Sequence, residues 1–290
     1  TAAKINIKLA EPDLPIIKEI SFISQNQRLV FEELKKIYQQ PTGRNLIMKA
    51  GGGKTFVGNA LIQFLRRNTL IVVPNKEIGA AWEKVINEYI CECGMIGGGR
   101  NIKSRVTVGT IHSLIKLPRE WFKYFECVIY DEITEFVSDK RRTIFDLASA
   151  PFLLGLTATP DIPRCKIFEL NIGPRLIATE IKGYSEEEIP WKVSLYPIKY
   201  HGADENTIRI KSKIGLTSTV EMDKQFMMDD ERNKLIIEKV KYLRSIGKNI
   251  FIFTSLCEHT EILKNLIEES VIYTGSKKEN IETAPIIITT

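Results

Sequence analysis

The sequence contains no apolar run that approaches the roughly 18–20 residues of a membrane-spanning helix. Its N-terminal stretch, TAAKINIKLAEPDLP, carries charges and a proline where a secretory signal peptide needs an apolar core. These absences argue against membrane insertion and against export. We therefore predict a cytoplasmic protein.

Cysteine and histidine are also scarce, with five and three residues. Among the cysteines only Cys91 and Cys93 lie close together, and a disulfide framework or a zinc site would need a second close pair. We therefore expect five reduced thiols, at Cys91, Cys93, Cys127, Cys165 and Cys257.

The 290 residues suffice for about two domains, and the 43% hydrophobic content is ordinary for a globular protein. The net charge of +5 permits a polyanionic partner without requiring one.

Short apolar runs alternate with helical patterns along most of the chain. Strands are expected at residues 4–9, 45–50, 69–74, 105–110, 126–132, 151–160, 249–255, 270–275 and 284–290. Helices are expected at residues 13–20, 27–38, 55–67, 77–90, 229–246 and 258–267. This alternation predicts an α/β fold with a parallel sheet covered on both faces.

The composition divides the chain into four parts. Residues 1–24 form a short N-terminal strand and helix, and residues 25–188 a first domain. Residues 189–228 are polar and poor in helix signals, which indicates an inter-domain connection. Residues 229–290 begin a second α/β domain, in which the chain stops.

The stretch NLIMKAGGGKT places three glycines between a predicted strand and a predicted helix. Bare backbone N–H groups of Gly51, Gly52 and Gly53 can approach phosphate oxygens, and the helix adds its positive N-terminal end. Lys54 would reach the β- and γ-phosphates of ATP, and Thr55 would bind Mg²⁺. The usual pattern has a glycine or alanine where this chain has Met48, and a plain surface turn is the alternative.

A phosphate site of this kind predicts an acidic residue at the end of another strand, and CVIYDEIT supplies it. Asp131 could bind Mg²⁺ through water, and Glu132 could polarise the attacking water as a base. Acidic pairs after a strand also cap helices, so the assignment depends on the upstream glycine loop.

The ordered series GGGKT, VVPN, VGT, DEIT, GLTATP, FIFTS and IIITT resembles the motifs of superfamily 2 helicases and translocases over nearly the whole chain. The resemblance implies a RecA-like first domain that binds ATP and Mg²⁺, followed by an incomplete second RecA-like domain. GLTATP is more typical of DNA translocases than of RNA-directed DEAD-box proteins.

The resemblance also implies roles for single residues. Gln27, with Gln25 as a competitor, would read the adenine edge, and Thr157 and Thr159 would couple ATP to nucleic-acid movement. The residues implied to grip the phosphodiester backbone are Pro74, Asn75, Gly109, Thr110, Thr254, Ser255, Thr289 and Thr290, although Asn75 replaces the usual threonine.

The glycine turn, VGT strand and EWF segment within residues 96–132 resemble phage branch-migration helicases of the UvsW type. This implies remodelling of forked or branched DNA in recombination and repair, in the host cytoplasm if the chain is phage-encoded. Unlike that group, the chain has no cysteine and histidine after its acidic pair, and His112, His201 and His259 are isolated. A shared core of the wider class would also explain the likeness.

Two further groups of residues have open roles. Arg100, Lys103 and Arg105, and the run Lys140, Arg141 and Arg142, could contact phosphates or form a solvated face. Trp121, Phe122, Tyr124 and Phe125 could stack on bases, but we expect core packing for at least two of them.

No QxxGRxxR segment, which supplies arginines to the ATP site in these enzymes, occurs in the chain. We expect a C-terminal extension in the complete enzyme and slow hydrolysis by this fragment. Two other functions remain open: a translocase subunit of a restriction or nuclease system, and a nucleotide-gated clamp that is not a motor.

Overall fold

The computed structural model describes residues 9, 11–159, 162–185, 194–200 and 218–290. The chain divides into two compact units, Thr1–Lys192 and Val193–Thr290, and each is considered by itself. In the part that the structure describes, no helix is long and apolar enough to cross a lipid bilayer.

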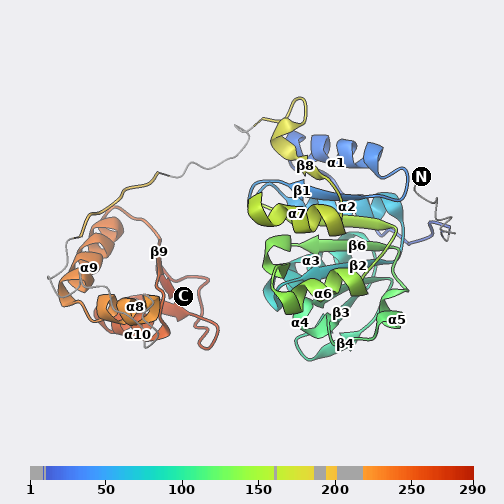
Figure 1. Ribbon diagram of the computed structural model, residues 1–290. Helices are drawn as coiled ribbons and strands as arrows, with labels where there is room; N and C mark the ends of the chain where they lie inside the picture. The colour runs from blue at the N-terminus through green and yellow to red at the C-terminus, as the bar shows by residue number, and fades with distance from the viewer. Residues whose placement is uncertain (1–8, 10, 160–161, 186–193, 201–217) are drawn as a thin grey trace. The chain divides into compact units, whose positions relative to one another are not determined.

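The first unit is built on an eight-stranded sheet in the order β4-β3-β5-β2-β6-β7-β1-β8 (Figure 1). Its strands are β1 (Gly43–Ile47), β2 (Thr69–Val73), β3 (Cys93–Gly97), β4 (Arg100–Ile102), β5 (Val106–Thr110), β6 (Cys127–Asp131), β7 (Phe152–Thr157) and β8 (Arg175–Ile177). Every neighbouring pair is parallel except β3 and β4. The carboxyl ends of β1, β2, β5, β6 and β7 therefore share one edge, where ligands bind in open α/β sheets.

Two layers of helices cover this sheet (Figure 1). One face packs against α1 (Gln25–Ile37), α2 (Lys54–Leu65) and α3 (Lys76–Tyr89). The other packs against α4 (Ile111–Leu114), α5 (Arg119–Phe122), the 3₁₀ helix η1 (Ile133–Phe136), α6 (Asp139–Leu147) and α7 (Ile162–Asn171). A second 3₁₀ helix, η2 (Ala178–Glu180), follows β8.

The alternation of side chains along β6 shows how the sheet serves both layers. Cys127 and Ile129 pack on the α1–α3 side, whereas Val128 and Tyr130 pack on the α4–α7 side. All are buried, as expected for a strand covered on both faces. Asp131 continues the alternation, so its side chain faces α2 and α3. The predicted α/β fold is confirmed.

One predicted helix is wrong. Residues 13–20 contain no helix, because their backbone groups pair with other elements. Leu14 N donates to Arg66 O, and Ile17 N donates to Ile90 O, both at 3.1 Å. Leu14 is fully buried in the core of the α1–α3 side. Of the strand predicted at residues 4–9, all but residue 9 lies outside the described residues.

The second unit contains α8 (Thr219–Met227), α9 (Asp230–Ser245), β9 (Ile250–Phe253), α10 (Cys257–Leu266), β10 (Ser270–Tyr273) and β11 (Ile286–Thr289). The three strands are parallel in the order β10-β11-β9. Helices α9 and α10 bury Val240 and Leu263 against Ile250, Ile286 and Ile288. Helix α8 lies within the residues 189–228 that were expected to be poor in helix, and Ser218 caps it.

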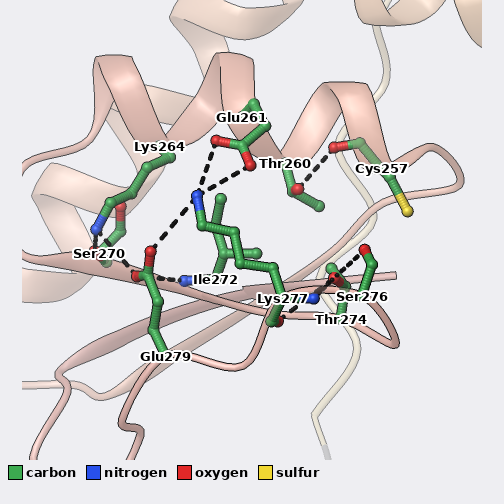
Figure 2. A network of polar contacts seen from close by, with 10 residues as sticks. All are labelled: Cys257, Thr260, Glu261, Lys264, Ser270, Ile272, Thr274, Ser276, Lys277 and Glu279. Atoms are coloured by element: carbon green, nitrogen blue, oxygen red, sulfur yellow. Dashed lines mark hydrogen bonds and ion pairs between the residues drawn. The ribbon is translucent and has the colours of Figure 1, made fainter.

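Ion pairs hold the chain after β10 against α10 (Figure 2). Lys277 Nζ lies 3.0 Å from Glu261 of α10 and 3.6 Å from Glu279. Lys264 of α10 contacts the Ser270 carbonyl and lies 3.4 Å from Glu279. These basic side chains therefore already have acidic partners inside the unit.

Candidate functional site

The glycine loop follows β1 at the carboxyl edge of the first sheet. Gly51 and Gly53 have φ angles of 74° and 88°, which side chains rarely adopt. A Cβ on Gly53 would also lie 2.2 Å from Gln27 Nε2. Gly53 is the N-cap residue of α2, so the loop delivers the chain directly to a helix N-terminus. The three glycines thus form a backbone surface that alanine could not reproduce.

Met48, the departure from the usual loop pattern, is buried beneath this surface with 1% exposure. Its N–H donates to Thr157 O at 3.0 Å, and its carbonyl accepts from Lys54 Nζ at 3.4 Å. The Met48 thioether lies close under Gly52. The larger side chain is therefore accommodated in the core, and the loop keeps its curvature.

Lys54 and Thr55 open α2, and the Lys54 side chain faces Glu132, which follows β6. The Lys54 ammonium lies 3.8 Å from Glu132 Oε1, although the two residues come from distant parts of the chain. Only β7 separates β1 from β6 in the sheet. Thr55 is partly buried in the first turn. The structure therefore brings Lys54, at the start of α2, next to Glu132.

Asp131 ends β6 and is 5% exposed. Its Oδ2 accepts a 2.7 Å hydrogen bond from Trp82 Nε1 of α3, and its Oδ1 accepts from Glu132 N at 3.0 Å. Burial raises the pKa of Asp131, while the Trp82 N–H and the Lys54 charge oppose that rise. The partner Trp82 did not emerge from the motifs, because a tryptophan in an amphipathic helix looks like any other core residue.

Glu132 has φ 52°, one of three positive-φ side-chain residues in the part of the chain described by the structure. This left-handed turn follows β6 immediately and directs the carboxylate toward Lys54. Burial raises the pKa of Glu132, and the Lys54 charge opposes the rise. Strained backbone of this kind is concentrated at functional sites.

Gln27 packs against the glycine loop, whereas its competitor Gln25 is exposed at the start of α1. Gln27 Oε1 accepts from Ile23 N at 3.0 Å, and Nε2 donates to Gly52 O at 3.3 Å. The Gln27 side chain thus connects the segment before α1 to the phosphate loop.

Thr157 ends β7, between the strands that carry the glycine loop and Asp131. It is 1% exposed, and its Oγ1 accepts from Thr159 N at 3.2 Å. Because Met48 N donates to Thr157 O, the turn at Thr157–Thr159 is bonded to the strand that enters the loop. The two threonines therefore lie beside both halves of the candidate ATP site.

The residues implied to grip nucleic acid in the first unit lie on adjacent strand ends. Val73 pairs with Thr110, so Pro74 and Asn75 follow β2 next to the end of β5. The exposed Asn75 caps α3, accepting from Ile78 N at 3.0 Å. Gly109 and Thr110 are buried, and Thr110 Oγ1 donates to Ser113 Oγ at 3.1 Å. Ser113 and the exposed His112 are the more accessible groups there, and the motifs did not include them.

In the second unit, the implied gripping residues also meet at one sheet edge. Thr254 N donates to Thr289 O at 2.9 Å, because β9 and β11 are parallel neighbours. Ser255 and Thr290 are exposed beside them. The structure therefore groups these four residues.

The basic residues near the glycine turn after β3 have internal partners. Arg100 forms two 2.7 Å hydrogen bonds with Glu83, and Arg105 bonds Asp13 and Asn68. Lys103 Nζ lies over the Trp121 and Tyr124 rings, 4.8 and 4.4 Å from their centroids. These contacts favour a structural role over phosphate binding for all three.

The contacts of the second basic run and of the aromatic segment also favour structural roles. Arg141 contacts Glu135 and Arg142 contacts Asp139, on an exposed surface. Phe122 and Phe125 are 2% and 3% exposed, which confirms core packing for two of the four aromatic residues.

Among the described residues, no three or more His, Cys, Asp or Glu side chains lie together in a group that could hold a metal ion. The thiols of Cys91, Cys93, Cys127 and Cys257 are free. Mg²⁺ usually binds through one or two carboxylates plus substrate phosphates, and the Asp131 carboxylate at the end of β6 is a ligand of that kind. The open glycine surface and Lys54 would be the phosphate-binding half of such a site.

A glycine loop at a helix N-terminus, with Lys54 facing the Glu132 carboxylate, is the arrangement found in α/β domains of the P-loop class. The family model described as "Type III restriction enzyme, res subunit" matches residues 20–162. Residues 20–162 therefore contain a helicase domain similar to that family, and the motifs of the chain resemble those of superfamily 2 helicases and translocases.

Curated relatives carry related names. The "DNA 3'-5' translocase XPB2" of Sulfurisphaera tokodaii is 30% identical over 158 residues, covering 53% of this chain and 35% of the relative. The "Putative ATP-dependent RNA helicase QP509L" of African swine fever virus is 27% identical over 253 residues, covering 80% and 47%. The chain thus spans between about a third and a half of these relatives' length.

The fold of this chain is also found in a solved ATPase core. The Sulfolobus solfataricus SWI2/SNF2 ATPase core in complex with dsDNA aligns over 98% of this chain and 80% of its own, with TM-score 0.51 and 13% identity. The UvsW helicase from bacteriophage T4 aligns over 57% of this chain and 64% of its own, with TM-score 0.45 and 21% identity.

Proposed function

We propose that this chain is the motor part of an ATP-dependent DNA helicase or translocase that remodels forked or branched DNA. The observation that carries the proposal is the arrangement of Lys54 and Glu132, 3.8 Å apart across the carboxyl edge of the sheet. A lysine of a glycine loop beside a strand-end carboxylate is the arrangement needed to bind a triphosphate and activate water.

Each residue has a defined task in this proposal. The backbone N–H groups of residues 51–53 and the start of α2 bind the phosphates, and Lys54 binds the β- and γ-phosphate oxygens. Thr55 and Asp131 would hold Mg²⁺, Asp131 through water. When bound, Mg²⁺ supplies charge neutralisation at the phosphates. Glu132 orients the attacking water and accepts its proton.

To bind the adenine edge, Gln27 would give up one of its present hydrogen bonds, with Ile23 N or with Gly52 O, and bond the base instead. Its amide already spans from Ile23 to Gly52, so base recognition and the shape of the phosphate loop would be linked. Thr157 and Thr159 are proposed to transmit changes at the phosphates, because Thr157 is bonded to the strand leading into the loop.

Nucleic acid would bind at the carboxyl edges of the sheets, mainly through its phosphodiester backbone. In the first unit we propose Pro74, Asn75, Gly109 and Thr110, with Ser113 added as an accessible hydroxyl. In the second unit we propose Thr254, Ser255, Thr289 and Thr290. We further propose residues 25–188 as the ATP-binding domain and residues 229–290 as the start of the second RecA-like domain.

Both DNA and RNA are named among the relatives: one is called a DNA translocase and another a putative RNA helicase. We favour DNA because GLTATP is the form typical of DNA translocases in the resemblance described above. The similarity of residues 20–162 to a restriction-enzyme subunit supports a second candidate, a translocase subunit of a restriction system. Cleavage of DNA by the full-length protein would favour that candidate.

The test is ATP hydrolysis by the full-length protein with single-stranded, duplex, forked and four-way DNA, and with matched single-stranded RNA. We expect the strongest stimulation by forked and four-way DNA. Equal stimulation by all DNA forms would remove the preference for branched substrates, and stronger stimulation by RNA would remove the preference for DNA. A strand-displacement assay with Glu132→Gln separates a motor, which loses unwinding, from a passive clamp.

A further inference from the structure

We propose that Trp82 is a positioning residue for Asp131: its indole N–H holds the carboxylate in one orientation for metal binding. This inference rests on the proposed binding of ATP and Mg²⁺ at the glycine loop. It assigns a role to a residue of α3 that belongs to none of the motifs.

The contact itself is short and enclosed. Trp82 is fully buried, Asp131 is 5% exposed, and 2.7 Å separate Nε1 from Oδ2. A buried indole N–H needs an acceptor, but many carbonyl oxygens could serve. Here the acceptor is a carboxylate, which makes the bond charge-assisted and stronger than one to a neutral group.

Helix α2 has a glycine, Gly58, where the indole ring of Trp82 packs against it. A Cβ at Gly58 would lie 2.5 Å from Cη2 of Trp82. Glycine inside a helix is less favourable than alanine, so this position weakens α2 where the tryptophan ring lies. The same helix begins with Lys54 and Thr55. Trp82 therefore packs on the helix that supplies the phosphate-binding residues while bonding the opposite acid.

The hydrogen bonds of Asp131 leave room for a metal. Oδ1 accepts from Glu132 N and Oδ2 accepts from Trp82, which uses two of the roughly four lone-pair sites of a carboxylate. The remaining sites are available for water ligands of Mg²⁺. Partners of this kind orient metal-binding groups, and their loss typically costs about 10–100-fold in metal affinity or activity.

Trp82→Phe removes the N–H donor and also the outer ring atoms that lie against Gly58, so a loss of packing is expected as well and the test must separate the two effects. Asp131 is then free to rotate toward the Lys54 ammonium. We expect the gain in ADP affinity produced by Mg²⁺ to fall about 10–100-fold. Affinity for ADP without Mg²⁺ should stay within about twofold, because the glycine loop and Lys54 do not contact the indole N–H.

The experiment titrates a fluorescent ADP analogue into the 290-residue chain, with Mg²⁺ and with EDTA. The matched control is Trp121→Phe, because Trp121 is a partly buried tryptophan on the other face of the sheet. A Trp82→Phe protein that keeps the full Mg²⁺-dependent gain overturns the inference. Equal losses with and without Mg²⁺ also overturn it, since they indicate a packing role. If the unaltered chain shows no Mg²⁺-dependent gain, the proposed function itself fails.

Two further measurements separate positioning from packing. In an Asp131→Asn background, Trp82→Phe should change Mg²⁺ dependence no further, whereas an additional loss contradicts action through Asp131. In the unaltered, ADP-loaded protein, adding Mg²⁺ should shift the indole N–H NMR signal of Trp82 but not that of Trp121. The three tryptophans can be assigned with Trp121→Phe and Trp191→Phe, so this readout does not require Trp82→Phe to fold. An unmoved Trp82 signal contradicts the proposal.

Discussion

Lys54 of the glycine loop and Glu132 of the acidic pair form an ion pair, with 3.8 Å between the ammonium nitrogen and Oε1. The Lys54 side chain is 10% exposed and the Glu132 side chain 33%, so the lysine is shielded from water while the carboxylate stays partly accessible. In the proposed mechanism, Lys54 would turn from this carboxylate to a phosphate when nucleotide binds, which would leave Glu132 free to orient water. The same contact would then connect nucleotide binding with hydrolysis.

Glu132→Gln is expected to lower ATP hydrolysis by about 10²–10⁴-fold, the usual contribution of a general base. ATP affinity should be unchanged or higher, because Lys54 loses a competing carboxylate. Single-turnover phosphate release and equilibrium ATP binding, measured on the full-length protein, check both parts. Glu135→Gln is the control, since this exposed neighbour pairs with Arg141 outside the site. Equal hydrolysis by the two variants would exclude Glu132 as the base.

Gly53→Ala is expected to damage the loop. The residue has φ 88°, and the new methyl group would lie 2.2 Å from Gln27 Nε2. A left-handed conformation alone costs a residue with a side chain about 1–2 kcal/mol. Nucleotide affinity and the free energy of unfolding should therefore both fall, as measured by titration and denaturant unfolding.

The control for this prediction is Gly275→Ala in the second unit. A Cβ at Gly275 meets nothing within 4 Å, so Gly275→Ala should change the free energy of unfolding by less than about 0.5 kcal/mol. Similar effects at the two positions would show that the loop does not require glycine.

Acidification should weaken the second unit through His259. Its ring is buried and lies 2.9 Å from Asn233 Oδ1; burial, and then the Arg232 charge, lower the pKa of His259 below 6.5. The unfolded chain binds the proton that the folded state disfavours, so this contribution is complete above pH 6.5 and is lost as pH falls below it. Denaturant midpoints at pH values on either side of 6.5 measure the loss.

His259→Gln should reduce this pH dependence, because glutamine can donate to Asn233 without titrating. His112→Gln, at an exposed histidine of the first unit, should leave it intact. The account is wrong if His259→Gln keeps the pH dependence of the unaltered protein.

The sequence predicts the parts of the site that depend on local pattern. The strand–glycine–helix order of residues 45–67 and the strand ending at Asp131 both occur as expected, because buried parallel strands read as continuous apolar runs. The left-handed turn at Glu132 could not be predicted, since it depends on the position of Lys54 across the sheet.

Long-range contacts account for the remaining differences. The segment at residues 13–20 has helix-like composition but bonds the ends of α2 and α3, so tertiary pairing overrides local preference. Lys103 looked like a phosphate ligand, yet it lies over an aromatic cluster from a later part of the chain. Trp82 and Gly58 belong to none of the motifs. Trp82 meets Asp131 and Gly58 only in the folded structure, so the sequence could not predict these contacts.

The most direct test of the central claim is ADP and ATP affinity, with and without Mg²⁺, for the unaltered chain, Lys54→Ala and Asp131→Asn. Loss of a charged hydrogen bond costs about 1.5–3 kcal/mol, so Lys54→Ala should bind about 10–100-fold more weakly in both conditions. Asp131→Asn should lose only the part of the affinity that Mg²⁺ adds. Unchanged affinities in both variants would show that nucleotide and metal do not bind between these two residues.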